Sequence, residues 1–437
     1  MAVQTNGVQQ KALKINLDAR KFGTFAEIGA GQEVARWFFH AGRAADTVAK
    51  CISAYDMAIS EGLYGPTEQN VSRQRLEAML DSEFKELTER LDRTRGEATA
   101  FFVFADTAAT QTHSQRPVGH AWLGIRFQTE PRADPSEIII HVETLDPATA
   151  DQQEALSLAG VNLIYGAFYY LDDPNHLVGT LIDDLSRRRI EVDLIKFSGP
   201  AFAGVDNRLM SLQLVEQGLT DTAIFTADGE VAQPAEVLYN KPVLIERGSF
   251  RPVTNVTMDM LDRVAGQPRQ DSTPPSRDMV VIMEMTLNSL ISERAIDHQH
   301  FLAWLDILGA LGKMVMISNY TSLDRVSSYL RQYTQNWIGM VMGVSTLRQV
   351  FEEESYTDLD GGILEGLGRL FKGRVKLFVY QTKPAETGAI STADDLDLKP
   401  QLRHLYSFLF ENEFIESIRE FDTGEVHFTP GGVPAKL

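Results

Sequence analysis

The chain has 437 residues, 43% of them hydrophobic and 23% charged, a composition that argues against disordered, collagen-like and coiled-coil proteins. Lys and Arg number 41 against 60 Asp and Glu, and the resulting formal net charge of -19 argues against nucleic acid and membrane surfaces as partners. The single cysteine, Cys51, cannot form an internal disulfide, and no signal peptide or membrane span is recognisable. We therefore expect a cytoplasmic protein of two or three domains.

The first part of the chain mixes predicted strands and helices. Residues 25–28 favour a strand, and residues 33–42 favour a helix that follows a glycine-rich turn. A long amphipathic helix is predicted over residues 73–95. The other predicted elements are strands at residues 101–107, 120–128, 137–145, 220–226 and 241–247, and helices at residues 152–170, 177–186 and 235–239. This order predicts a domain with a mixed sheet over residues 1–265.

The second part of the chain is more regular. Residues 266–277 are rich in Pro, Gly, Ser and charge, which is typical of a linker. Beyond the linker, near-continuous apolar strands alternate with helices: strands at 279–286, 313–319, 338–344 and 374–380, and helices at 298–311, 322–333 and 364–371. Such alternation predicts right-handed crossovers and a doubly wound parallel sheet over residues 278–437. The fold class expected for the whole chain is α/β.

Gly29 and Gly31 form the first candidate ligand-binding motif. They stand between a predicted strand and a predicted helix, where glycines allow close approach of a ligand and the helix start favours an anion. Val34 occupies the position of the third glycine of a full dinucleotide fingerprint. The motif is compatible with nucleotide binding or with a tight structural turn. Asp56 is a possible ribose partner.

Arg247, Ser249 and Arg251 form the second candidate. They follow a predicted strand directly, and loops after the carboxyl ends of strands are where open α/β sheets bind ligands. Two guanidinium groups and a hydroxyl suit a phosphate or a carboxylate. In so acidic a chain, these arginines could instead pair with Glu246 or with distant carboxylates.

The strands at residues 279–286 and 313–319 resemble the haloacid-dehalogenase phosphohydrolase pattern, in which one strand ends in a nucleophilic Asp motif and a later strand ends in Ser or Thr. Ser318 and Asn319 match the later element, so they join the candidate ligand-binding residues. Met283 and Met285 stand where the resemblance requires the catalytic acids, and a thioether cannot attack phosphorus. Strand alternation is expected to turn Glu284 away from the ligand side. The resemblance therefore implies the fold without the hydrolase activity.

No metal site is expected. His298 and His300 lie two residues apart at a predicted helix start, where their side chains diverge. The sequence contains none of the HExxH, CxxC, P-loop or GxSxG signatures.

Blocks over most of the chain resemble a widespread family of bacterial cytosolic proteins. Its members carry the conflicting labels nicotinate-nucleotide adenylyltransferase and TonB-dependent receptor. The first label requires an HxGH signature and the second an exported protein, and neither matches this sequence. The blocks that carry the resemblance are residues 14–39, 58–65, 160–170, 197–202, 205–215 and 243–254.

The loops at Gly29–Gly31 and Arg247–Arg251 suit an anion, but no nucleophile or general base accompanies them in the sequence. This combination leads to one main hypothesis. We expect a homo-oligomeric protein that binds a small anionic metabolite, such as a nucleotide, in a regulatory or assembly role. One alternative is a nucleotidyl or phosphoryl transferase of nucleotide metabolism, with Arg247 and Arg251 on phosphate and Mg²⁺ as cofactor. The other is a self-assembling scaffold without a ligand.

Overall fold

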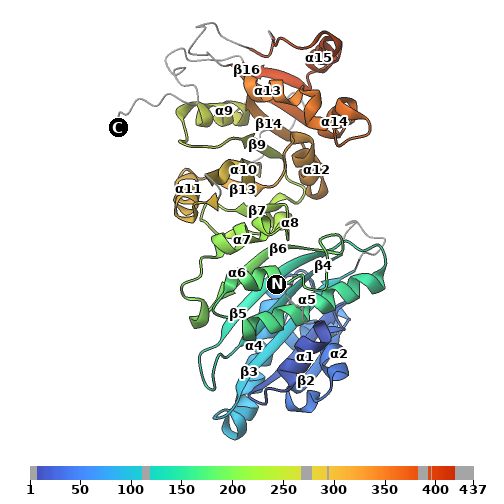
Figure 1. The fold of residues 1–437 in the computed structure, drawn as a ribbon, viewed down its shortest axis with the longest axis vertical. Helices are drawn as coiled ribbons and strands as arrows, with labels where there is room; N and C mark the ends of the chain where they lie inside the picture. The colour runs from blue at the N-terminus through green and yellow to red at the C-terminus, as the bar shows by residue number, and fades with distance from the viewer. Residues whose placement is uncertain are drawn as a thin grey trace, which may run out of the picture. The chain divides into compact units, whose positions relative to one another are not determined.

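The computed structural model describes residues 7–110, 119–266, 278–292, 295–381, 392–394 and 396–418. The chain divides into two compact units, Met1–Ala223 (unit 1) and Ile224–Leu437 (unit 2). Each unit is built on its own mixed sheet with helices against it, so the fold class is α/β as expected (Figure 1).

Unit 1 contains a six-stranded sheet of order β2-β1-β3-β4-β5-β6. Strand β1 runs parallel to both β2 and β3, whereas β3, β4, β5 and β6 pair antiparallel in succession. The strands are β1 Lys21–Gly29, β2 Val48–Ala54, β3 Ala100–Ala109, β4 Gly119–Phe127, β5 Ser136–Thr144 and β6 Ile190–Ser198. The mixed sheet predicted for the first part of the chain is confirmed.

The helices of unit 1 cover this sheet because each carries an apolar face. Residues of α1, α2, α5, α6 and α7 share one core with the inward side chains of the sheet, while α4 contacts β1, β3 and β4. Phe25 and Phe104, paired on β1 and β3, lie in that core with ring centroids 6.0 Å apart. The helices are α1 Val8–Asn16, α2 Val34–Ala41, α3 Met57–Tyr64, α4 Arg73–Arg95, α5 Thr149–Tyr169, α6 Pro174–Thr180 and α7 Asn207–Glu216.

Unit 2 contains an eight-stranded sheet of order β16-β15-β14-β9-β10-β13-β7-β8. From β9 the chain proceeds through β10 to β13 on one side, then returns to β14, β15 and β16 on the other, and these pairs are parallel. The strands are β7 Thr222–Phe225, β8 Val231–Ala232, β9 Val243–Arg247, β10 Val280–Thr286, β13 Met314–Ser318, β14 Ile338–Gly343, β15 Val375–Tyr380 and β16 Ile415–Ile418. This is the strand order of a doubly wound nucleotide-binding fold, which reverses between β9 and β14.

Helices form the crossovers of unit 2 and pack against its sheet. A single large core joins residues of α8, α12, α13, α14 and α15 with one face of the strands. The helices are α8 Pro234–Leu238, α9 Asn255–Gly266, α10 Leu287–Leu290, α11 His298–Ala310, α12 Leu323–Tyr333, α13 Val344–Val350, α14 Gly362–Leu370 and α15 Arg403–Glu411. A short hairpin joins β11 Ile291–Ser292 to β12 Ala295–Ile296. No helix among the described residues is long and apolar enough to cross a membrane.

The domain boundary predicted at residues 266–277 differs from the division in the structure, which falls between Ala223 and Ile224. The reason is strand pairing: β9 hydrogen-bonds between β10 and β14, so the chain from β7 onward belongs to the second sheet. Residues 267–277 of the predicted linker lie outside the described residues. Strands β2 and β6 were not predicted, and the helix expected at residues 177–186 is α6, which ends at Thr180.

Candidate functional site

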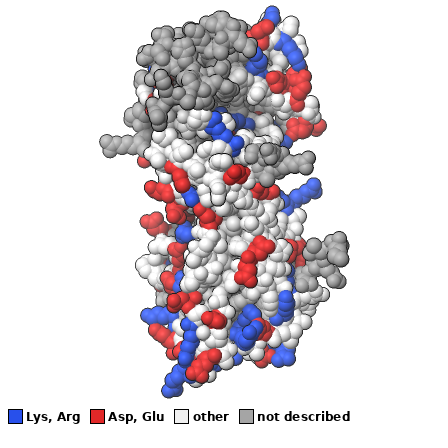
Figure 2. All heavy atoms as spheres, turned by 60° about the vertical axis from the view of Figure 1, so that its left-hand side comes forward, with Lys and Arg blue, Asp and Glu red and all other residues white. Residues whose placement is uncertain are grey.

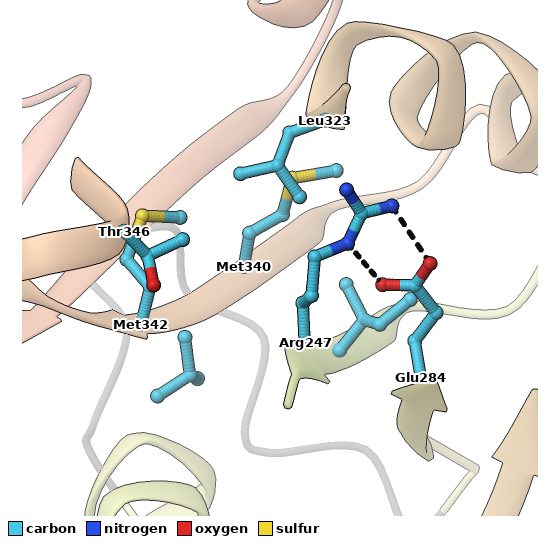
Figure 3. Close-up of a pocket in the computed structure, with 8 residues that line it drawn as sticks. Arg247, Glu284, Leu323, Met340, Met342 and Thr346 are labelled. Carbon is cyan, nitrogen blue, oxygen red and sulfur yellow. Dashed lines mark hydrogen bonds and ion pairs between the residues drawn. The ribbon is translucent and has the colours of Figure 1, made fainter. Parts of the chain in front are cut away.

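A small pocket opens in unit 2 at the point where the strand order reverses. Its walls come from the carboxyl ends of β9, β10 and β14 and from the first turns of α12 and α13 (Figure 3). In doubly wound sheets this is the crevice where ligands bind. The volume open to a water-sized molecule is about 10 Å³, which accommodates roughly one water. The lining residues are Ile245, Arg247, Glu284, Leu323, Met340, Val341, Met342 and Thr346.

Arg247 and Glu284 form a bidentate ion pair on one side of this pocket (Figure 3). The Arg247 Nε donates to Glu284 Oε2 at 2.5 Å, and Nη2 donates to Oε1 at 2.7 Å. Ser318 at the end of β13 donates its hydroxyl to the same Glu284 carboxylate. The strand register brings these two side chains together, because Arg247 and Glu284 are paired positions on the neighbouring parallel strands β9 and β10.

The buried ion pair decides what Arg247 can do. The Glu284 side chain is 0% exposed and that of Arg247 only 17%. Two more Arg247 N–H groups donate to the carbonyl oxygens of Tyr320 and Thr321 at 3.1 and 3.3 Å, so four of its five N–H groups have acceptors. Because its charge is paired with Glu284 and most of its donors are used, Arg247 has the geometry of a structural ion pair rather than of an anion contact. Its partner is Glu284 and not Glu246.

The expectation that Glu284 turns away from the side of Ser318 was wrong. Both side chains lie on the same face of the sheet and are hydrogen-bonded, because Thr286, two residues beyond Glu284, is the register partner of Ser318. Met283 and Met285 are the residues on the opposite face, and both are fully buried. The signal in the sequence was a lone acid within an apolar strand, where a buried acid is either paired with a cation or kept protonated.

Arg251 differs from Arg247 in having no carboxylate partner among the residues that the structure describes. Its guanidinium lies over the Trp304 ring of α11 at 3.4 Å from the centroid. The Nε and Nη2 atoms of Arg251 are buried and make no hydrogen bond with the described residues. Burial lowers the pKa of this guanidinium, and no neighbouring carboxylate offsets that effect. Arg251 is therefore a positioned cation at the carboxyl edge of the sheet.

Ser249 and Asn319 also lie at the carboxyl edge of unit 2. Ser249 is exposed in the loop that follows β9, and Asn319 is exposed directly after β13. Phe250, between Ser249 and Arg251, is buried and adopts a φ of 48°. Because the Phe250 side chain is buried, it holds Ser249 and Arg251 at the carboxyl edge of the unit 2 sheet. The structure thus gathers five of the predicted site residues in unit 2, whereas Gly29 and Gly31 belong to unit 1.

The glycine turn of unit 1 has its helix start already occupied. The Glu27 Oε1 atom accepts the N–H groups of Val34 and Ala35 at 2.9 and 3.3 Å, which are the groups an anion would need. Gly29 has a φ of 77°, and a Cβ at this position would lie 2.2 Å from the Ala108 carbonyl oxygen. Of the two alternatives for Gly29 and Gly31, nucleotide binding and a tight structural turn, this geometry fits the structural turn.

A pair of buried carboxyl groups lies under this turn. Glu27 and Asp106 are paired positions on β1 and β3, and both are 2% exposed. Burial raises the pKa of Glu27 to about 7, opposed by the N–H groups of α2, while burial and the charge of Glu27 raise that of Asp106 well above its usual range. The sequence shows one acid in each of two predicted strands, but it does not show that these strands pair with Glu27 beside Asp106.

The remaining cluster of titratable groups is on β4, β5 and β6. Asp193 Oδ1 lies 2.6 Å from His141 Nδ1, and His141 Nε2 lies 3.3 Å from His120 Nδ1. The strand β6 that supplies Asp193 was not predicted, so the contact of Asp193 with His141 could not be predicted either. Asp56, the possible ribose partner, instead caps α3 by accepting the Ile59 N–H at 3.1 Å.

Charge is dispersed over the molecule rather than gathered at one metal-binding cluster. Figure 2 shows Asp and Glu interleaved with Lys and Arg over the face that it draws. No group of three or more His, Cys, Asp or Glu within the described ranges could hold a metal ion.

No protein-family model matches the chain, and no curated protein is significantly similar to it in sequence. Among solved structures, the competence/damage inducible protein CihA from Agrobacterium tumefaciens is 18% identical, with a TM-score of 0.26 over 37% of this chain and 93% of that one. A competence-damaged protein (CinA) superfamily protein from Enterobacter cloacae is 12% identical, with a TM-score of 0.28 over 38% of this chain and 94% of that one. Likeness at this level carries no functional argument, and the family resemblances drawn from the sequence stay predictions.

Proposed function

We propose that unit 2 binds a small anionic ligand of the nucleotide class across the carboxyl edge of its sheet, with Arg251 as the cation that holds the negative group. The observation that carries this proposal is the Arg251 guanidinium in the loop after β9, stacked on Trp304 with no carboxylate partner in the described part of the chain. That loop is where doubly wound folds hold phosphate groups.

The same loop supplies a second attraction for an anion. It leads into α9, a helix of 12 residues that begins at Asn255, so its positive dipole end lies on the chain close to Arg251. The exposed Ser249 and Asn319 add a hydroxyl and an amide at this edge. Because the pocket beside Arg247 holds about one water, the ligand lies over the edge and not inside that pocket.

The role of the site is binding without turnover, in a regulatory or assembly protein of the cytoplasm. The acid at this edge, Glu284, is fully buried and bound to Arg247 and Ser318, so it is not available to position Mg²⁺ or to take a proton. A transferase would require such an acid beside the phosphate groups.

Thermal shift measurements test this proposal on the full chain. ATP, NAD and inorganic phosphate should each be titrated, and at least one nucleotide should raise the melting temperature by several degrees at saturating concentration. Arg251→Ala should abolish that shift, while Arg251→Lys should retain part of it. The matched control is Arg325→Ala, which removes a half-exposed arginine of the same unit from its pair with Asp358.

Two results would contradict the proposal. An undiminished shift in Arg251→Ala would remove this loop from the site. Turnover of the nucleotide with Mg²⁺ would favour the transferase alternative over a binding role.

A further inference from the structure

Strand β2 ends the sheet of unit 1, and its outer edge has no strand partner among the described residues (Figure 1). Parallel strands are normally covered on both faces, but in β2 the side chains of Cys51 and Ser53 are exposed. An open edge presents a row of unpaired backbone N–H and C=O groups, which is a template for another strand.

The segment that follows β2 carries a concentration of exposed apolar side chains. Tyr55 is 76% exposed, Met57 41%, Ile59 59% and Leu63 42%. In helix α3 only Ser60 is buried, and Ile59 and Leu63, one turn apart, form an exposed apolar face. A helix in contact with water on that face would show the reverse pattern. The open edge and the apolar helix face are neighbours along the chain and together form what we call the β2–α3 surface, Val48–Leu63.

We propose that the β2–α3 surface is the interface of a homodimer in which β2 pairs antiparallel with β2 of a second copy across a two-fold axis. The open backbone edge offers its N–H and C=O groups to a strand, and the sequence of β2 is compatible with its own copy in that place. Cys51 is the middle residue of Val48–Ala54, so an antiparallel self-pair centred there brings the two Cys51 residues opposite each other.

Charge is compatible with this self-pairing. Lys50 is the single charged residue of β2, and centring on Cys51 places it opposite Ile52 of the other copy rather than opposite its own equivalent. The Lys50 ammonium is already paired with Glu83 and Glu86, both at 2.5 Å. The axis therefore brings no like charges together, and the two sheets join into one.

Cross-linking through Cys51 tests the arrangement, because it is the single cysteine of the chain. Directly opposed residues of an antiparallel pair have Cβ atoms about 5 Å apart, so a short bifunctional maleimide should yield a covalent dimer. Burial and the nearby Glu27 carboxylate raise the pKa of the Cys51 thiol to about 11, so the reaction should be run at mildly alkaline pH. Cys51→Ser should give no covalent dimer and should keep the mass of a dimer in light scattering.

Two variants separate loss of the interface from loss of the fold. Cys51→Lys places like charges opposite each other at the axis, while its ammonium can reach Glu27, whose Oε2 lies 3.9 Å from the thiol. Ile59→Lys puts charge on the apolar face of α3. Each should weaken the dimer by about tenfold or more and leave the far-UV circular dichroism and the melting temperature of the isolated monomer unchanged. Phe408→Lys, at a residue 55% exposed in unit 2, is the control and should leave the mass unchanged.

The outcomes decide the proposal independently of the nucleotide site. A dimer that cross-links at Cys51 and dissociates in both variants supports it. A monomer at every concentration tested overturns it, as does an oligomer that neither cross-links at Cys51 nor responds to Cys51→Lys and Ile59→Lys.

Discussion

Glu27 and Asp106 occupy paired positions on two adjacent parallel strands, which brings two buried carboxyl groups together beneath the turn that contains Gly31. A Cβ on Gly31 would lie 2.0 Å from Asp106 Oδ1, so the turn is closed directly over the second acid. Asp106 Oδ1 has no hydrogen-bond partner within the described residues. This relationship predicts how the stability of the protein depends on pH.

The free energy of unfolding should fall as the pH rises from about 4.5 to about 7, because the pKa of Glu27 is raised from 4.5 to about 7 in the folded state. In that interval folded Glu27 retains a proton that the unfolded chain has released, so its contribution to stability is complete below pH 4.5 and is lost through pH 7. Asp106→Asn removes one of the two acids and should stabilise the protein at pH 8 by roughly 1–3 kcal/mol. Urea unfolding at several pH values measures both effects. The control is Glu68→Gln, at an exposed carboxylate, and an equal effect there would contradict the assignment.

Removal of one partner from the buried ion pair of unit 2 should be strongly destabilising. Glu284→Leu leaves Arg247 buried without its carboxylate and should cost about 3–5 kcal/mol in the free energy of unfolding. The double variant Glu284→Leu with Arg247→Met should recover most of that loss, because no charge remains buried. Denaturant unfolding of the single and double variants measures the coupling. A double variant no more stable than Glu284→Leu would show that the pair is not the cause.

Gly29 should tolerate a side chain less well than another glycine with a similar backbone angle. Gly29 and Gly42 have φ values of 77° and 87°, but a Cβ on Gly42 meets nothing within 4 Å. Gly42→Ala should therefore cost about 1 kcal/mol from backbone strain, and Gly29→Ala at least about 2 kcal/mol more from its contact with the Ala108 carbonyl. Equal melting temperatures of the two variants would contradict the structural role of the Gly29 turn.

The histidine cluster predicts a defined tautomer for His141. A carboxylate can only accept, so Asp193 fixes a proton on His141 Nδ1, while His141 Nε2 faces His120 Nδ1 at 3.3 Å. Nitrogen NMR of labelled protein should show His141 as the Nδ1–H form, with a proton that exchanges slowly because the ring is 1% exposed. Asp193→Ala should release the tautomer and speed that exchange. His300, which is exposed and pairs with Asp297 at 2.8 Å, provides the comparison within the same spectrum.

Much of the architecture could be predicted because it depends on local periodicity. The helix predicted over residues 73–95 is α4, and the alternating strands and helices beyond residue 278 are those of the doubly wound sheet. Strand β6 was missed although its apolar residues alternate with Glu191, Asp193 and Lys196, a spacing that favours a strand. The partners of its two acids, Arg187 and His141, are brought together only in the folded chain. Strand β2 was missed because only Ala54 of its seven residues is buried and it lacks a strong apolar pattern.

The sequence alone determined the α/β class, most helices and strands, and the loop that carries Arg251, because these follow from the spacing of apolar residues and from turn chemistry between neighbours in the chain. Strand order was decided only by the tertiary structure, and with it the assignment of β9 to the second sheet. The partners of the two arginines were decided there as well. Arg247 is bound to Glu284, 37 positions away, while Arg251 lies on Trp304 and pairs with no acid that the structure describes. Partners of buried charges depend on which strands lie side by side, and that register is a property of the whole fold.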